Sequence, residues 1–470
     1  MNDFFLLAKQ ELALVLIIFL LLIIKVGSKE WENPRVLGLI NLLLLLNFAT
    51  GFIYQQEGIL FNEMFHTSKL IIIEKNILNA GTLIVSWLAF DWLKQQQHVI
   101  EFYVLLLTTL LGMQLMISAG NLLMFYLSLE MASIPLAALA NFDLQKRQSA
   151  EAAMKFIISS AFSSGLLLFG ISFIYGTTGT LVFTELPQQL QSTPLQLFAL
   201  VLVMAGFAFK ISVVPFHLWT ADVYQGSPVA VTAYLSVVSK GAAVFAFINV
   251  LYTVLQPLAA SWYPVICVLS VATMCIGNLF ALKQTNIKRL LAFSSITQAG
   301  FILVGISGSS QTGMATVLYF VLVYLFSNLG IFTVVALVSA HTGKEEVADY
   351  KGFYGTNPVL SWVMALSIFS LAGIPPAAGF FGKFFLLMAG AGKGNYVLVV
   401  IAALNMIVSL YYYLLVVKTV FIDKHAQAPV DAIKVKSYPA LALIICSAGV
   451  LTLGLASQVY EYIFSISQGM

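Results

Sequence analysis

Long runs of apolar residues, separated by short polar, charged or Gly/Pro-containing breaks, extend along almost the whole chain. A helix needs roughly 20 mostly apolar residues to cross a bilayer, with a range of about 17–25. Cutting the chain at its breaks predicts about fourteen such helices. Their expected ranges are 8–26, 36–54, 75–92, 99–118, 120–141, 151–175, 195–223, 228–253, 262–281, 289–307, 312–341, 358–391, 395–421 and 437–463. The pattern predicts an all-α integral membrane protein.

Two of these segments are more polar than the others. The third opens with Glu74, Lys75 and Asn76, and the tenth contains two adjacent serines, a threonine and Gln298. The charges of the loops test the count independently, because cytoplasmic loops are enriched in Lys and Arg. With the N-terminus outside, the inside loops collect Lys29, Arg35, Lys94, Lys146, Arg147, Lys283, Lys288, Arg289, Lys344, Lys351, Lys424, Lys434 and Lys436.

The outside loops at 176–194, 254–261 and 308–311 contain no Lys or Arg. The main exceptions are Lys9, Lys69 and Lys393. This asymmetry is what the positive-inside rule predicts for an even number of helices with both termini outside. We therefore expect about 14 helices in a bacterial inner membrane, with both termini on the periplasmic side.

Two segments contain proline in the middle of an apolar run. The seventh carries FKISVVPFH at 209–217, and the twelfth carries AGIPPAAGFFGK at 372–383. Proline removes a backbone donor and clashes with the preceding turn, so both helices are expected to be broken. They lie five helices apart and so run in opposite directions. Broken helices at matching places in two inverted halves indicate a transport site, although proline kinks also occur in membrane helices that transport nothing.

The breaks predict an internal repeat, with helices 4–8 forming one half and helices 9–13 the other. The expected units are 1–95 for helices 1–3, 96–255 for the first five-helix repeat, 256–421 for the inverted second repeat, and 422–470 for helix 14.

Composition narrows the classes of function. The chain is 60% hydrophobic and 9% charged, whereas soluble domains carry about 25% charged residues. The net charge of +3 is too small and too dispersed to indicate nucleic-acid binding. The three cysteines show no C-x-x-C spacing, and no nucleotide-binding glycine motif precedes a helix. We therefore expect no metal, cofactor or catalytic residue in this chain, and any redox chemistry would lie in partner subunits.

Several ionisable residues lie within the predicted spans. They are Glu130 in helix 5, Lys155 in helix 6, Lys210 and His217 in helix 7, Lys240 in helix 8 and Lys383 in helix 12. A charge at mid-bilayer costs about 2.5–3.5 kcal/mol, so four central charges would cost roughly 10–14 kcal/mol. The central groups are expected to face one another or buried water.

A structural ion pair of Glu130 with Lys210 or Lys155 is one alternative, but it leaves Lys240 and Lys383 without an acidic partner. Desolvation disfavours the charged form of a buried lysine, which can then exchange protons near neutral pH. We therefore interpret Glu130, Lys155, Lys210, Lys240 and Lys383 as proton-transfer residues. Lys155 lies close to a helix end, where its ammonium can also reach water.

His217 suits a proton-loading site, and a buried imidazole with a structural role is an equal alternative. It follows Lys210 by seven residues, a spacing that would place both on one face of an unbroken helix.

The run FKISVVPFHLWTADVYQGSP at 209–228 resembles the strongest motif of the antiporter-like subunits of respiratory complex I. The run SLEMASIP at 128–135 and the stretch from Ala161 to Thr180 resemble subunit N of NADH-quinone oxidoreductase most closely. The similarity extends from about helix 4 to helix 13. The M-type relatives carry glutamate where this chain has Lys383, and the L-type relatives have a long lateral helix that this sequence lacks.

The resemblance implies a transport role for Glu130, Lys210, Lys240 and Lys383. It implies an assembly with the other antiporter-like subunits and the small membrane subunits of complex I, in which partner subunits hold FMN, iron–sulfur clusters and quinone. The expected function is therefore that of a proton-translocating membrane subunit of NADH-quinone oxidoreductase. The alternatives are a subunit of a multisubunit sodium/proton antiporter and a structural membrane subunit that transports nothing.

Overall fold

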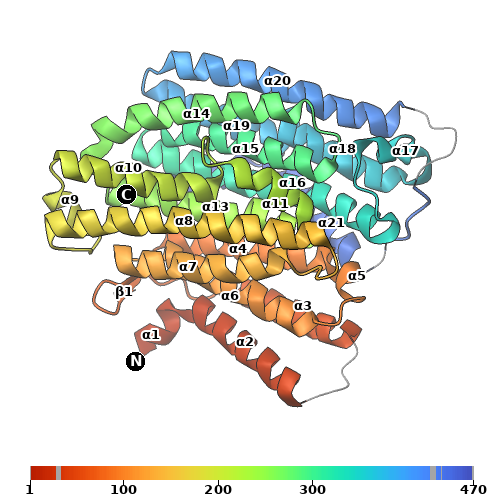
Figure 1. Ribbon diagram of the computed structural model, residues 1–470, viewed down its shortest axis with the longest axis horizontal. Helices are drawn as coiled ribbons and strands as arrows, with labels where there is room; N and C mark the ends of the chain where they lie inside the picture. The colour runs from red at the N-terminus through yellow and green to blue at the C-terminus, as the bar shows by residue number, and fades with distance from the viewer. Residues whose placement is uncertain (1, 28–32, 424–429, 436, 468–470) are drawn as a thin grey trace.

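A computed structural model describes residues 2–27, 33–423, 430–435 and 437–467. Long helices lie side by side and run back and forth along one direction (Figure 1). Among the described residues, thirteen helical segments are long and apolar enough to cross a membrane, and the two shorter helices α18 (Pro358–Ala372) and α19 (Ala378–Gly392) form one further broken span. The prediction of an all-helical membrane protein with about fourteen spans is confirmed.

The first part of the chain contains short elements between its long helices. Their bounds are α1 Asn2–Leu7, α2 Lys9–Gly27, α3 Asn33–Thr50, β1 Gly58–Leu60, β2 Phe65–Thr67, α4 Lys69–Leu88, α5 Phe90–Leu93, α6 Val99–Ile117, α7 Leu122–Ala140, α8 Arg147–Thr178 and α9 Leu186–Gln189. The strands β1 and β2 form a small antiparallel hairpin.

The remaining helices and helical turns continue the bundle. They are α10 Pro194–Ile211, α11 Leu218–Gly226, α12 Val229–Tyr234, the π-helical turn η1 Leu235–Ser239, α13 Lys240–Thr253, η2 Gln256–Leu258, α14 Ala259–Ala281, α15 Ile287–Ile306, α16 Ser310–Thr342, η3 Val347–Tyr350, α17 Phe353–Thr356, α18 Pro358–Ala372, α19 Ala378–Gly392, α20 Tyr396–Phe421, α21 Tyr438–Leu455 and α22 Ser457–Ile466.

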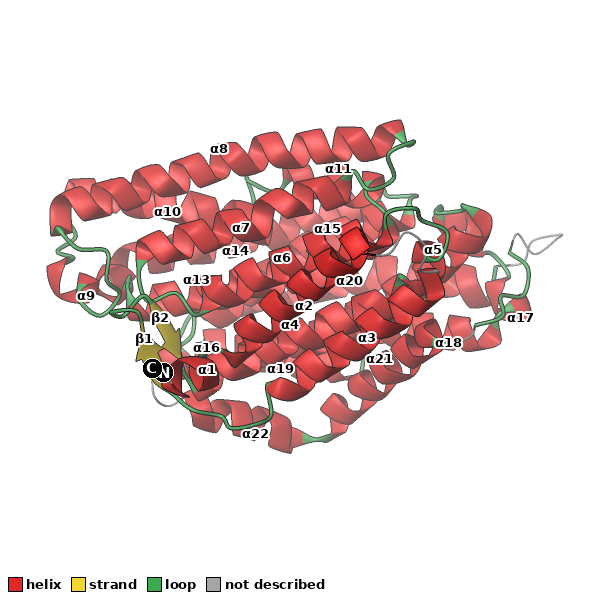
Figure 2. Ribbon diagram, turned by 90° about the horizontal axis from the view of Figure 1, so that it is seen from below, coloured by secondary structure: helices red, strands yellow, loops and turns green. Residues whose placement is uncertain are grey.

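The two ends of the bundle differ in charge. One end carries β1, β2, α9 and both termini, and we call it the hairpin end (left in Figure 2). The opposite end, near α5 and α17, carries Lys94, Lys146, Lys283 and Lys351 among other basic residues, and we call it the basic end. The alternation of basic loops in the sequence therefore corresponds to one end of the molecule. The basic residues Lys29, Lys424 and Lys436 lie outside the described residues.

Polar side chains define where several helices begin at the hairpin end. Ser68, Asn121 and Thr193 each accept a hydrogen bond from the backbone N–H of the third residue beyond them. Such caps satisfy amides that have no partner within the helix.

Both predicted breaks are present. The helix α10 is followed by Ser212, which has a φ of 67°, and α18 is followed by Gly373, which has a φ of 87°. A residue in the left-handed backbone conformation ends a helix because it turns the chain away from the helix axis. The chain then resumes as α11 and α19 respectively. The grouping into two inverted repeats, and the unit boundaries at 95, 255 and 421, stay predictions.

Two predicted spans have different bounds in the structure. The third span begins at Lys69 rather than at residue 75, so Glu74 and Lys75 lie inside α4 and are buried. The fourteenth span is not one helix, because α21 ends at Leu455 and α22 begins at Ser457. The polar tenth span is α15, which is almost entirely buried among other helices, so its hydroxyl groups contact protein and not lipid.

Candidate functional site

Lys210 lies in the last turn of α10, where the helix breaks. Its ammonium donates hydrogen bonds to the hydroxyl oxygens of Ser133 on α7, at 2.5 Å, and Ser160 on α8, at 2.9 Å. Glu130 is one helical turn before Ser133 and therefore on the same face of α7. Its charge acts on Lys210 without a direct ion pair, and its Oε1 is buried without a hydrogen-bond partner among the described residues. The ammonium of Lys210 therefore binds two serine hydroxyls and does not form the ion pair with Glu130 that was one alternative.

Lys240 is the first residue of α13, directly after the π-helical turn η1. Turns of this kind occur often at functional sites. The side chain is buried, with 4% of its surface exposed, and its ammonium donates to the hydroxyl of Ser295 at 2.5 Å and to the carbonyl of Ser295 at 3.3 Å. The hydroxyls of Tyr224 and Tyr324 lie beside the same serine. The ammonium of Lys240 therefore lies in a buried polar cluster that contains no carboxylate among the described residues.

Lys383 is 1% exposed and lies on α19, beyond the second break. Its ammonium donates to the carbonyls of Leu371, at 2.7 Å, and Ala372, at 3.3 Å, which are the last residues of α18. It also lies 4.9 Å from the centre of the Phe301 ring. The negative end of the α18 dipole and an aromatic face therefore replace the missing acidic partner.

The helix α15 connects the surroundings of Lys240 and Lys383. Ser295 accepts from Lys240, and Gln298, one turn later, donates to the carbonyl of Leu371, which also accepts from Lys383. Gln298 also donates to the hydroxyl of Tyr413, which is hydrogen-bonded to Ser294. In the sequence, these polar residues only make the tenth span more polar than most others. Their hydroxyls and amides supply groups that can pass or orient a proton.

We expect Ser295→Ala to weaken proton transfer through Lys240 while the protein still folds, because the substitution removes the hydroxyl that binds the ammonium but leaves the helix intact. The measurement is the rate of proton translocation by the assembled protein. Ser307→Ala is the matched control, since this buried hydroxyl, on the residue that follows α15, donates to the carbonyl of Val304 and to no other group among the described residues. An equal effect of both substitutions would contradict this role.

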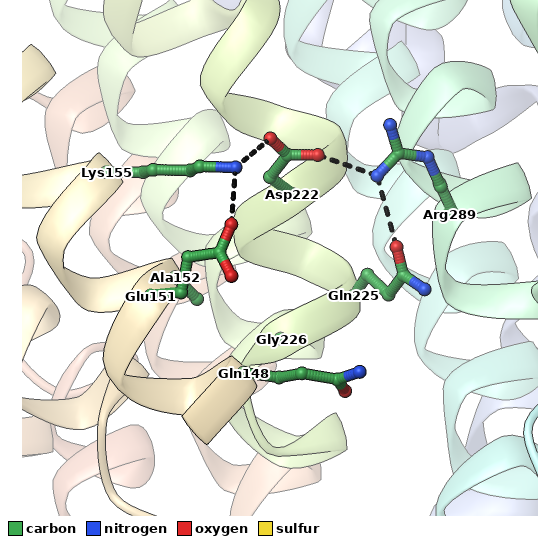
Figure 3. A pocket seen from close by; sticks show the side chains of 8 residues that line it. All are labelled: Gln148, Glu151, Ala152, Lys155, Asp222, Gln225, Gly226 and Arg289. Carbon is green, nitrogen blue, oxygen red and sulfur yellow. Dashed lines mark hydrogen bonds and ion pairs between the residues drawn. The ribbon is translucent and has the colours of Figure 1, made fainter. Parts of the chain in front are cut away.

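Lys155 lies in a polar pocket of about 240 Å³ at the basic end (Figure 3). Its ammonium is 2.8 Å from a carboxylate oxygen of Glu151 and 2.6 Å from one of Asp222 on α11. Asp222 also binds Arg289 of α15 at 2.6 Å. The side chain of Lys155 is 43% exposed, so it joins a water-accessible network and does not pair with Glu130. This placement agrees with the alternative that its ammonium reaches water.

His217 precedes the first residue of α11 and is buried, with 7% of its surface exposed. The break between Lys210 and His217 removes the common helical face that an unbroken helix would give them. The Nδ1 atom of His217 has no hydrogen-bond partner among the described residues. The imidazole therefore has one ring nitrogen available for a proton. Its role as a proton-loading site and its structural role both stay predictions.

A second group of buried charges was missed. Lys75 of α4 forms an ion pair of 2.6 Å with Glu11 of α2, and both side chains are almost fully buried. The adjacent Glu74 is completely buried. The available signal was the run Glu74-Lys75-Asn76, which was treated as a span boundary although charges inside a span indicate function by default.

Comparisons with known proteins place these features in a family. Residues 119–409 match the family of membrane subunits described as NADH:quinone oxidoreductase/Mrp antiporter. The chain is 47% identical over 454 residues to NADH-quinone oxidoreductase subunit N of Phocaeicola vulgatus, covering 96% of this chain and 95% of that protein. It is 46% identical over 475 residues to the subunit N of Azobacteroides pseudotrichonymphae, covering 99% and 98%.

Solved structures share the fold. A chain of respiratory complex I from Thermus thermophilus with bound aureothin superimposes with a TM-score of 0.80 at 29% identity, covering 95% of this chain and 97% of that chain. A chain of the Mrp complex from a Dietzia species superimposes with a TM-score of 0.86 at 20% identity, covering 98% and 97%.

The broken helices and buried lysines thus define an antiporter-like membrane subunit of the NADH:quinone oxidoreductase/Mrp type. The full-length similarity is more specific than the fold. The chain belongs to the family of NADH-quinone oxidoreductase subunit N, an antiporter-like membrane subunit of complex I.

Proposed function

We propose that this chain translocates protons through Glu130, Lys210, Lys240 and Lys383 as the subunit N of a complex I. Electron transfer from NADH to quinone takes place on FMN and iron–sulfur clusters in other subunits and drives this transport. The observation that carries the proposal is the burial of Lys240 and Lys383 within the bundle, where neither forms an ion pair with a carboxylate among the described residues.

In the proposed cycle, Glu130 approaches Lys210 and favours its charged form. When the two groups move further apart, the ammonium keeps its hydrogen bonds to the hydroxyls of Ser133 and Ser160 but loses the influence of the carboxylate, and its proton becomes easier to lose. The proton moves along buried water to Lys240, and from there past the polar groups of α15 to Lys383, which releases it on the outer side. Changes in neighbouring subunits supply the direction.

The pocket around Lys155 provides the uptake side of this scheme. It is polar, lies at the basic end and is joined through Asp222 to α11, the second half of the broken helix. His217 at the start of α11 is the proposed intermediate group between this pocket and Lys210. The basic end is the cytoplasmic side of a bacterial inner membrane, which puts both termini in the periplasm.

The partners of the subunit decide between the two transport alternatives. Purifying the tagged chain in its native assembly is expected to recover flavoprotein and iron–sulfur subunits together with the other antiporter-like subunits and the small membrane subunits. Recovery of small membrane proteins without a flavoprotein would identify a sodium/proton antiporter assembly instead. The 47% identity with a subunit N favours the first result.

A further inference from the structure

Glu74 is a buried carboxylate that the proposed cycle does not use. It lies in the second turn of α4, is completely buried, and accepts a hydrogen bond of 3.2 Å from the side-chain amide of Asn249 on α13. Its other oxygen, Oε1, has no hydrogen-bond partner among the described residues. A buried carboxylate with an unpartnered oxygen is costly when charged, so Glu74 is suited to bind and release a proton.

The nearest basic group does not compensate this carboxylate directly. Lys75 is the next residue of α4, and its ammonium is 2.6 Å from Glu11 and 4.9 Å from the centre of the Phe65 ring. Glu11, Glu74 and Lys75 together have two carboxylates and one ammonium, and the charge of Lys9 also acts on Lys75. Among these three buried residues, one negative charge is in excess when both acids are ionised, and binding one proton removes it.

Asn249 joins Glu74 to a cavity of about 270 Å³ beneath β2, which we call the hairpin cavity. Its lining includes His66, Phe183, Thr184, Asn249 and Thr253. His66 Nε2 and Asn249 Oδ1 are buried polar atoms without a hydrogen-bond partner among the described residues. A cavity of this size with such groups can hold several water molecules, since one water occupies about 30 Å³.

The same helix leads from this cavity to the lysine row. Lys240 begins α13, and Asn249 follows nine residues later, which corresponds to roughly 13 Å along the axis at 1.5 Å per residue. The helix α4 lies near the start of α13, because a Cβ atom on Gly241 would lie 3.2 Å from Val321 of α16 and 3.8 Å from Leu78 of α4. Glu74, one turn from Leu78, thus lies between Lys240 and the hairpin end.

We propose that Glu74, Asn249 and the hairpin cavity form a proton outlet from Lys240 to the aqueous phase at the hairpin end, separate from Lys383. This inference rests on the proposed function. The ammonium of Lys240 gives its proton through water to the carboxylate of Glu74, leaving a neutral amine and a carboxylic acid. The acid then gives the proton to water of the hairpin cavity and returns to the carboxylate.

The test uses the assembled complex in proteoliposomes, with NADH-driven proton translocation measured per electron transferred. Four variants are compared: Lys210→Ala, Lys383→Ala, Glu74→Gln, and Glu74→Gln combined with Lys383→Ala. Glutamine retains the hydrogen bond from Asn249 but cannot take up the proton. With two outlets, each single outlet variant loses part of the translocation that Lys210→Ala removes, and the combination loses all of it. Glu57→Gln is the control, because that carboxylate is exposed at the same end.

A combined variant that pumps as well as Lys383→Ala alone would overturn the outlet while leaving the proposed function intact. The same holds if Lys383→Ala alone already reaches the level of Lys210→Ala. Normal pumping by Lys210→Ala would instead refute the proposed function itself.

A second measurement covers the case in which Glu74→Gln does not assemble. Asn249→Cys and Thr253→Cys are treated with a small membrane-impermeant thiol reagent applied from the hairpin side. We expect both cysteines to react and proton translocation to fall after modification. Absence of reaction, or reaction without a loss of translocation, would overturn the outlet.

Discussion

Combining Lys210→Ala with Glu130→Gln is expected to abolish most of the proton translocation by this chain while the complex still assembles. Positioned groups that transfer protons contribute about 10²- to 10⁴-fold to their step, so removing two of them leaves little flux. The substitutions remove one ammonium and one negative charge together, so no unpaired charge of either residue remains in the bundle. The measurement is the number of protons translocated per NADH oxidised in proteoliposomes.

A matched control separates this effect from a loss of charge in general. Lys25 and Glu101 form an ion pair of 2.8 Å near the basic end, and both side chains are more than 40% exposed. Exposed pairs contribute about 0–1 kcal/mol to stability, so Lys25→Ala with Glu101→Gln should pump normally. Normal pumping by the Lys210/Glu130 variant would refute the proposed cycle.

Gly379→Ala is expected to prevent correct assembly, because no space exists for the added methyl group. A Cβ atom on Gly379 would lie 1.7 Å from the carbonyl oxygen of Ser370. The glycine N–H also donates to the hydroxyl of Ser370, which bonds to Ser327 of α16. Overpacking commonly costs about 1–3 kcal/mol, and a clash with backbone is at the upper end because neither half-helix can yield. The yield of assembled complex measures the effect.

Gly165→Ala provides the comparison for Gly379→Ala. Gly165 lies in the long helix α8, and a Cβ atom there would meet nothing within 4 Å. In a helix interior, alanine is favoured over glycine by about 1 kcal/mol, so assembly should be unchanged or improved. Equal yields of the two variants would show that α18 and α19 can separate at the break without consequence.

The spans were predictable because only a few kinds of backbone structure can cross a membrane. The length of an apolar run predicts a crossing helix, and proline marks where the spans that carry Lys210 and Lys383 are interrupted. The alternation of basic loops was an independent signal, and the structure gathers those described residues at one end. These signals are local in sequence, so they need no knowledge of which helices are neighbours.

The partners of the buried charges were less predictable, since they depend on packing between distant segments. The pairing of Glu11 with Lys75 joins residues 64 positions apart, and nothing in either segment specifies the other. The sequence shows Ser295 only as a polar residue in an apolar span. Its hydrogen bond to Lys240 could not be predicted, because Lys240 lies on another helix. A charge inside a predicted span singled out Lys240, which the structure buries, and the same signal applies equally to the buried Glu74.

Fold similarity alone would not have separated the transport alternatives. The Mrp chain superimposes better than the complex I chain, with TM-scores of 0.86 and 0.80, although it is less similar in sequence. A shared scaffold therefore carries different partners and functions. Identity of 46–47% over nearly the full length, and not the shape of the bundle, assigns the chain to subunit N.

The contact between Lys383 and the end of α18 relates the protonation of this lysine to the position of the two half-helices. One ammonium on α19 holds two carbonyls of the other half-helix, and the end of a helix carries about half a negative charge. Releasing the proton would leave a neutral amine, which can still donate hydrogen bonds but no longer has the attraction of a positive charge to the end of α18. Lys383 would then couple its protonation to the angle between α18 and α19. Loss of the proton would allow that angle to change, and a change in the angle would in turn favour loss of the proton.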